Sequence, residues 1–480
     1  MNGDTFAEAV SYAIITVFML LSFIRQISFI IGSPIISICM EAFFLIFSII
    51  LIYRYRSYVS SIFITLRNFR SSNSISFIFL VLCFLYMVIH TFLHVPKEFF
   101  NEFYRLSVYE KSGFFQLATA SDFPAFLPIN HLVLFEPYLR FSAGSGEGIL
   151  CFLAYLSIGF STYALARRYS WQPTAFTVAI LVMSIPRLVV QAMHPGTQVI
   201  SVAVALFCIL AMYRTVELPN LTDLVLLVLG LFFCISENIS SMIYAPILFV
   251  LSWVVLSRRH GIIAWKSILT KNAWAFIFVI PTVIFSQSWL FLTNHFYKDS
   301  WSGAFSTIFF NTDGIQGALA NFIRYLLESF YFTAPLDLFF EKVFNWSMAQ
   351  PLQSLYDFFV RSFLGENGAA QAFDLTWMTD KMFSFGPVAF FLVLPALFYA
   401  MLKGPRRLKS VAIAFISYFY LVSLIFAWTP GTAELFEVFY VSAGFSMAFF
   451  FPPWRFTKKI KKNVQIAGCF LLFITLLTAS

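Results

Sequence analysis

The stretch KEFFNEFYRLSVYEK, residues 97–111, places three glutamates together in a chain of which only 11% is charged. It follows directly on the apolar run ISFIFLVLCFLYMVIHTFLHV. A carboxylate held just beyond a membrane span can take the proton of a substrate hydroxyl and so act as a general base. Glu102 also stands three residues before Arg105, a spacing that forms ion pairs on the surface of an amphipathic helix. Glu102 is therefore a candidate base, and a solvated helix cap is the structural alternative.

Other charged residues lie where an apolar chain rarely keeps them. Asp122, before the string FPAFLP, is a second candidate carboxylate. Arg187 follows Pro186 near the end of an apolar run, and charges at such depth usually face a cavity or a partner. The alternative is that its side chain snorkels to the membrane surface. Glu237 lies in a very short turn between two apolar runs, so we expect it to pair with Arg187 or with a loop arginine.

Apolar stretches of about 17–25 residues are long enough to span a bilayer as helices. The sequence contains about thirteen, and a reasonable range is 11–14. A soluble domain carries about a quarter charged residues, so we predict an all-α polytopic membrane protein. The expected spans are 9–31, 35–53, 75–95, 148–165, 173–191, 197–213, 221–236, 239–256, 273–294, 386–402, 409–428, 433–451 and 464–480.

Lysine and arginine gather in alternate connections between these spans, which predicts that those connections and the N-terminus are cytoplasmic. The net charge of +8 is thereby explained by topology, and nucleic acid is not expected as a partner. Two long segments, 96–147 and 295–385, fall on the outer side and contain amphipathic, partly helical stretches. We divide the chain into two N-terminal helices with a basic loop (1–74), a core (75–451) and a basic segment with a last helix (452–480).

Cofactor motifs are missing from the sequence. The six cysteines stand singly inside apolar runs, so neither a disulfide framework nor a zinc site is indicated. Neither a Walker A string nor G-x-G-x-x-G occurs. We therefore expect no nucleotide, no metal ligands and no cofactor, with a bound divalent cation as the alternative.

Several strings, taken in order, resemble the GT-C superfamily of membrane glycosyltransferases, in particular its bacterial branch that uses polyprenyl-phosphate sugars. They are NEFYRLSVYE with FLPINHLVLFEPYLRFSAG, IPRLVVQAMHPGTQ, ALANFIRYLLES, FSFGPVAFFLVLPALFYAML and FAWTPGTAELFEVFYVSAG. The resemblance implies a GT-C-like bundle with two long outer loops in the bacterial cytoplasmic (inner) membrane. It implies transfer of a sugar from a polyprenyl-phosphate donor to a glycan or lipid acceptor of the cell envelope, with inversion.

The resemblance also implies roles for single residues. The base would be Glu102, with Asp122 as runner-up, because the family keeps its acid in the first outer loop. A cation would hold the lipid phosphate, since arginine forks onto phosphate oxygens, and Arg324 of the Asn-x-x-Arg match fits that part best. The residues expected to bind substrate are Tyr104, Arg105, Arg187, His194, Glu237, Asn321 and Arg324.

The chain differs from the family in the sign of the charge at several positions. Glu237 aligns with a family lysine, and Glu434 and Glu437 stand near a family arginine. These departures keep other functions open: a polymerase or ligase of the O-antigen type, a lipid-linked glycan flippase or another transporter, and a catalytically silent scaffold. A transporter would predict inverted repeats and charges at mid-membrane, and neither is visible in the sequence.

Overall fold

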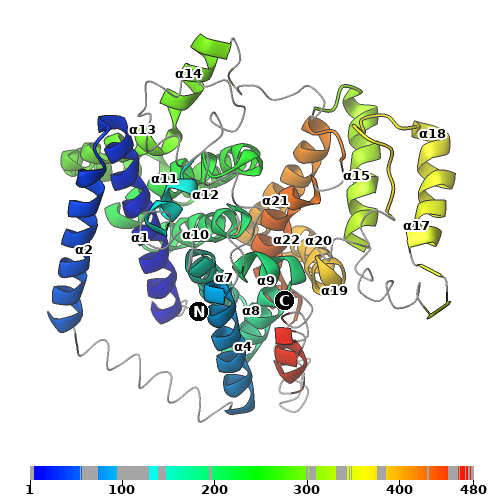
Figure 1. Cartoon of the computed structure of the whole chain (residues 1–480), viewed down its shortest axis with the longest axis horizontal. Coiled ribbons are helices and arrows are strands. Elements are labelled where there is room, and N and C mark those ends of the chain that lie inside the picture. The colour runs from blue at the N-terminus through cyan, green and yellow to red at the C-terminus, as the bar shows by residue number, and fades with distance from the viewer. Residues whose placement is uncertain are drawn as a thin grey trace.

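The computed structural model is built of helices throughout the part of the chain that it describes (Figure 1). That part comprises residues 5–54, 56, 74–93, 129–138, 148–193, 197–298, 301, 310–330, 343–344, 346–347, 349–375, 385–429, 432–451, 463, 465–470, 472–473 and 476. Within these residues the extended pairings are two isolated β-bridges, Phe310 with Phe426 and Ala369 with Trp428. The prediction of an all-α protein is confirmed.

Seven helices of the described residues are long and apolar enough to cross a membrane. They cover Phe6–Ile31, Ile35–Arg54, Gly148–Arg167, Gln198–Glu217, Ser240–Gly261, Gly386–Lys403 and Arg406–Ile425. Two bent pairs of helices raise the number to nine if each pair is one span. The chain is thus a membrane protein by helix length and composition, and the finer expectation of thirteen spans stays a prediction.

The remaining expected spans differ from one another in length. The helix α4 (Ser74–Leu93), with 20 residues, has the length of the expected span 75–95, whereas α11 (Leu221–Ile235), with 15 residues, is shorter than a bilayer requires. The stretch 433–451 is broken into η9 (Thr432–Phe436), α22 (Glu437–Ala443), η10 (Gly444–Ser446) and α23 (Met447–Phe450). Most of 464–480 lies outside the described residues.

The centre of the bundle is α10 (Thr197–Glu217), whose residues are almost all buried. It packs against α7 (Gly148–Arg167), α11 (Leu221–Ile235) and α12 (Ile239–Lys271). The first helix, α1 (Thr5–Ile31), also packs against α7 and α10, although it precedes the predicted core. In contrast, α2 (Pro34–Arg54) lies at the margin of the bundle and is largely exposed, as expected for a lipid-facing helix (Figure 1).

Ion pairs join the helix ends that the lysine and arginine pattern predicts to be cytoplasmic. Glu8 of α1 lies 2.7 Å from Arg168, just beyond the end of α7, and 3.0 Å from Arg214, near the end of α10. Arg214 also lies 3.5 Å from Asp223, in the first turn of α11. The side chain of Asn220 caps α11 by accepting from the Asp223 amide at 2.7 Å. One end each of α1, α7, α10 and α11 therefore lies on the same side of the bundle. This agrees with the prediction that successive connections alternate between the two sides of the membrane.

The second long segment contributes helices that lie at the margin of the bundle opposite α2 (Figure 1). Its helix α15 (Gly314–Phe330) packs along α21 (Arg406–Ile425) and contacts α19 (Gly386–Val388). The next helical stretch consists of α17 (Ala349–Tyr356), one π-helical turn (η6, Asp357–Arg361) and α18 (Ser362–Leu364). Figure 1 shows α15 between this stretch and α21.

Candidate functional site

Arg187 lies at a break between two helices. From the sequence we expected a single span over residues 173–191. The chain instead forms α8 (Gln172–Met183) and α9 (Pro186–Met193), which meet at 68°. Pro186 starts α9, where its missing N–H costs no hydrogen bond. Tyr155 donates its hydroxyl to the Met183 carbonyl at 2.7 Å, which satisfies one carbonyl freed by the break. The break places the arginine at the start of α9 with its side chain inside the protein.

Two carboxylates surround the buried guanidinium of Arg187. Its Nη2 lies 2.7 Å from Glu434 Oε1, and its Nε lies 3.5 Å from Glu437 Oε2. The guanidinium also stands over the Phe385 ring, 5.8 Å from its centroid. Arg187 and Glu437 are buried, whereas half of the Glu434 side chain is exposed. Ionic groups taken out of water need such partners, because each buried charge alone costs several kcal/mol.

A third carboxylate, Glu328 of α15, belongs to the same cluster. Its Oε2 accepts the indole N–H of Trp428 at 3.2 Å, and both side chains are buried. Burial raises the pKa of Glu328 to about 7, while the Trp428 hydrogen bond and the positive charge of Arg187 act in the opposite direction. A carboxyl whose pKa lies near neutrality can both hold and release a proton at physiological pH.

Aromatic side chains pack around these charged groups. Phe385, which touches Arg187, also packs against Tyr440 with ring centroids 4.7 Å apart. The Tyr440 hydroxyl is hydrogen-bonded to that of Ser329, the residue after Glu328, at 2.7 Å. Proton-accepting groups, a cation and flat apolar rings therefore converge on one place. We call it the Arg187 cluster, and it consists of Arg187, Glu328, Phe385, Trp428, Glu434, Glu437 and Tyr440.

Asn321 and Arg324, the Asn-x-x-Arg match, form a second buried polar centre. The Asn321 amide nitrogen reaches the carbonyls of Gly368, Ser423 and Phe426 at 3.0–3.3 Å. It thereby fastens α15 to the end of α21 and to the turn at Gly368.

The guanidinium of Arg324 is fully buried and is engaged by protein acceptors. It donates to the Tyr356 hydroxyl at 2.9 Å, to Asn321 Oδ1 at 2.7 Å and to the Asn367 carbonyl at 2.9 Å. A fourth bond, at 3.4 Å, reaches the Gly365 carbonyl. The predicted phosphate contact of Arg324 stays a prediction, and its observed contacts favour holding the 365–368 turn in place.

Glu237 does not pair with Arg187, whose carboxylate partners are Glu434 and Glu437. Its neighbour is His131, with Nδ1 to Oε2 at 3.4 Å, and Glu237 is completely buried. Burial raises the pKa of Glu237 well above its ordinary range. His131 was not among the residues predicted from the sequence. The signal was present in the string PINHLVLFEP, where polar residues interrupt an apolar run.

The same string is tied into the bundle by Asn130. Its amide nitrogen donates to the carbonyls of Phe233 and Phe285, both at 2.9 Å. Its Oδ1 accepts from Gln26 at 2.7 Å and from Gln287 at 2.9 Å. Gln287 has a φ of 48°, an uncommon value for a residue other than glycine. The end of the first long loop is therefore clamped between α1, α11 and α13 (Val279–Ser286).

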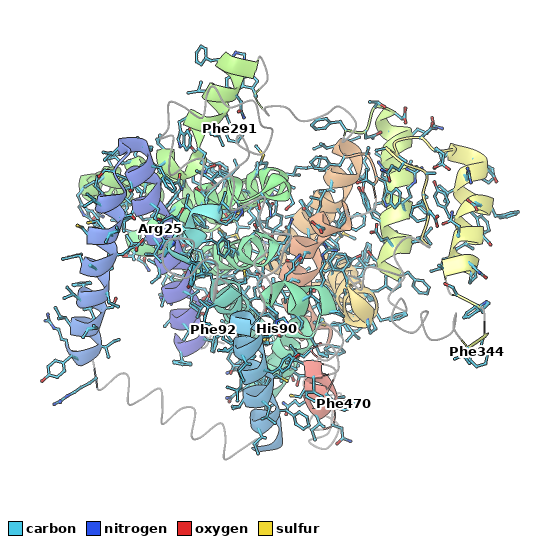
Figure 2. The ribbon with its side chains drawn as sticks, viewed as in Figure 1. Arg25, His90, Phe92, Phe291, Phe344 and Phe470 are labelled. Carbon is cyan, nitrogen blue, oxygen red and sulfur yellow. The ribbon has the colours of Figure 1, made fainter. Side chains whose placement is uncertain are left out.

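Arg25, which interrupts the first apolar run, stabilises the segment that follows Asn130. Its Nη1 donates to the carbonyls of Val133 and Leu134 at 3.0 and 2.7 Å, in the short η3 segment (Leu132–Phe135). Its Nε lies 2.9 Å from Glu41 of α2. Figure 2 shows Arg25 on α1 next to η3.

The structure brings four of the sequence-predicted site residues into three separate places. Arg187 is in the Arg187 cluster, Asn321 and Arg324 lie under the 365–368 turn, and Glu237 faces His131. The other predicted residues lie outside the described part of the chain: Glu102, Tyr104, Arg105, Asp122 and His194. Among the described residues, no group of three or more histidine, cysteine, aspartate or glutamate side chains is arranged to hold a metal ion.

The fold and the cluster define a class of protein: an all-α membrane protein with a buried cation–carboxylate site at one side of its bundle. Comparison with protein-family models, with curated proteins and with solved structures gave no match.

Proposed function

We propose that this chain is a membrane glycosyltransferase that moves a sugar from a polyprenyl-phosphate donor to a glycan or lipid acceptor of the cell envelope. The acceptor hydroxyl oxygen would attack the anomeric carbon, and the bond from that carbon to the phosphate oxygen would break. The lipid phosphate leaves with the bonding electrons, and a carboxylate takes the hydroxyl proton. The reaction needs a cation for the phosphate and a carboxylate base.

The Arg187 cluster is the observation that carries this proposal. Its arginine is buried at a helix break, and one of its two carboxylate partners, Glu434, is half exposed. A phosphate oxygen can replace the exposed Glu434 carboxylate on Arg187 without a net loss of negative charge beside the cation. The buried Glu437 stays in place, so the guanidinium keeps its orientation. Trp428 and Tyr440 are fully buried, and they hold Glu328 and Phe385 in position beside the arginine.

Three carboxylates are candidates for accepting the hydroxyl proton. Glu102 is the base that the resemblance implies, with Asp122 in reserve. Within the described residues the carboxyl best suited is Glu328, because its pKa of about 7 lets it change protonation state at neutral pH. The reaction would take place on the outer face of the bacterial cytoplasmic membrane, where the lipid-linked donor presents its sugar.

The test uses membranes that contain the full chain, a radiolabelled polyprenyl-phosphate sugar and an envelope acceptor. We expect transfer of label that Glu102→Gln abolishes and that Arg187→Gln lowers at least tenfold. Glu217→Gln is the matched control, because it removes a carboxylate from an ion pair with Arg168, just beyond the end of α7 and away from Arg187. Full activity of Glu102→Gln would exclude Glu102 as base, and full activity of Arg187→Gln would exclude the cluster.

A catalytically silent scaffold is the second candidate. Its supporting observation is that Arg187 and Arg324 both already have partners within the protein. In that case neither transfer nor movement of label occurs with any variant. Movement of labelled lipid across the membrane without a new glycosidic bond would instead identify a flippase.

A further inference from the structure

Helix α15 lies beside membrane-spanning segments, at the depth of their ends. Its Phe322 packs against Phe419 with ring centroids 5.0 Å apart, and Phe419 belongs to the span Arg406–Ile425. Its Phe330 packs against Phe390, also at 5.0 Å, inside the span Gly386–Lys403. A helix resting on the membrane surface would contact the loops above these spans. This one contacts residues within them.

The polarity of α15 is the reverse of that of a helix exposed to water. The face turned toward the protein carries Asn321, Arg324 and Glu328, all buried. The face turned away carries Ile315 and Leu319, which are 70% and 50% exposed. A water-facing helix buries its apolar stripe and exposes its polar one. The inverted pattern matches a helix whose outer face meets hydrocarbon.

The stretch α17–η6–α18 continues this apolar surface. Its inner side packs toward α15 through Tyr356, which accepts a hydrogen bond from Arg324. Its outer side exposes Leu355, Phe358, Phe359 and Phe363, the last to 78%. These positions follow helical spacing and form one stripe. Soluble proteins rarely expose such a contiguous apolar patch. Figure 2 shows Phe344, which precedes the stretch, at the far margin of the molecule from α1.

We propose that α15 and α17–η6–α18 form a lipid-embedded wedge, whose exposed stripe is covered by acyl chains of the adjacent membrane leaflet. The bilayer is the occupant that the structure favours, because α15 already packs against residues within two candidate membrane spans. The charges nearest the stripe pair with one another: Arg361 lies 3.0 Å from Glu366 and 3.6 Å from Asp357, which leaves this group one net negative charge. This wedge differs from the surface-lying amphipathic helices that the sequence predicts, and it is independent of the proposed function.

The experiment measures spin-label accessibility on the full chain in lipid nanodiscs. Cys39→Ser removes the exposed native cysteine, and the other five described cysteines are buried. Labels are placed at Leu319→Cys, Phe359→Cys and Phe363→Cys. The lipid standard is Ile46→Cys on α2, and the water standard is Leu218→Cys in the turn between α10 and α11, both exposed.

We expect the three labels to collide with oxygen several-fold more often than with a water-soluble nickel complex, as the Ile46→Cys label does. Nickel accessibility like that of Leu218→Cys would place the stripe in water and overturn the proposal. Low accessibility to both reagents would also overturn it, because the stripe would then be covered by protein. The substitutions lie at exposed positions, and an elution volume equal to that of the parent chain confirms folding.

Discussion

Trp428 donates its indole N–H to Oε2 of Glu328 at 3.2 Å, although the two residues lie 100 positions apart. Trp428 precedes the helical turns that carry Glu434 and Glu437, and Glu328 comes from the second long segment. This one hydrogen bond therefore fixes that segment against the residues that surround Arg187. It also holds a buried carboxyl whose pKa is raised to about 7.

Stability should fall as pH rises from 5 to 8, because the pKa of Glu328 is raised from 4.5 to about 7 by burial. The folded state binds the Glu328 proton more tightly than the unfolded state does, so the stabilisation is complete below pH 4.5 and is lost as pH rises through 7. One pKa unit corresponds to about 1.4 kcal/mol, so the loss is on the order of 3 kcal/mol. Thermal unfolding in detergent should show a smaller decrease across this range for Glu328→Gln. An identical decrease in both proteins would contradict the assignment to Glu328.

At pH 9 Arg187→Gln should destabilise the protein by about 3–5 kcal/mol, because Glu437, whose pKa burial raises to about 8, is then ionised and loses its cation. Arg187→Gln combined with Glu437→Gln should recover a large part of that loss, since no uncompensated charge then remains. The measurement is a double-mutant cycle of unfolding midpoints in detergent. Additive losses in the double variant would show that the two side chains are not coupled.

Asn321→Ala should weaken the attachment of the 365–368 turn. Three carbonyls would lose their common donor, and an unsatisfied buried polar group costs about 1–3 kcal/mol. Limited proteolysis should therefore cut the variant faster between residues 365 and 370. Asn220→Ala is the control: it removes a helix cap worth about 1 kcal/mol on α11 and should leave the turn protected. Equal cleavage of both variants would argue against the Asn321 attachment.

Gly368→Ala should be more harmful than Gly365→Ala, although both glycines have positive φ, 72° and 63°. A positive φ costs an alanine roughly 1–3 kcal/mol at either position, and Gly365, with a ψ of −153°, lies in a region that is essentially restricted to glycine. At Gly368 the added Cβ would also lie 2.6 Å from the Gly317 Cα, whereas at Gly365 no atom lies within 4 Å. Unfolding midpoints of the two variants test this difference. A Gly365→Ala loss as large as that of Gly368→Ala would rule out the close contact with α15.

The sequence predicted features that depend on local pattern. Apolar length located seven spans, and the amphipathic string around Asn321 located α15. Pro186 marked the place where the helical path breaks, and the depth of Arg187 indicated that its charge needs a partner. Each of these follows from helix geometry or from the cost of a charge in an apolar environment.

The sequence pattern did not predict contacts that form only through tertiary packing. Glu328 and Trp428 meet only because α15 packs along α21, and His131 reaches Glu237 only because the 129–138 segment enters the bundle. We expected Glu237 to pair with Arg187 or with a loop arginine, since Glu237 and Arg187 stand at ends of apolar runs on the same predicted side. That expectation ignored which helices are neighbours, and sequence spacing carries no information on helix order around a bundle.

The Asn130 clamp has a consequence for biosynthesis. Asn130 binds Gln26, which precedes it, but also Phe285 and Gln287, which follow it by 155 and 157 positions. While the ribosome is still making the helices between them, the Asn130 side chain has only part of its hydrogen-bond set. The end of the first long loop therefore completes its docking after α13 has been inserted into the membrane. Maturation of this region is set by the arrival of a later helix and not by its own synthesis.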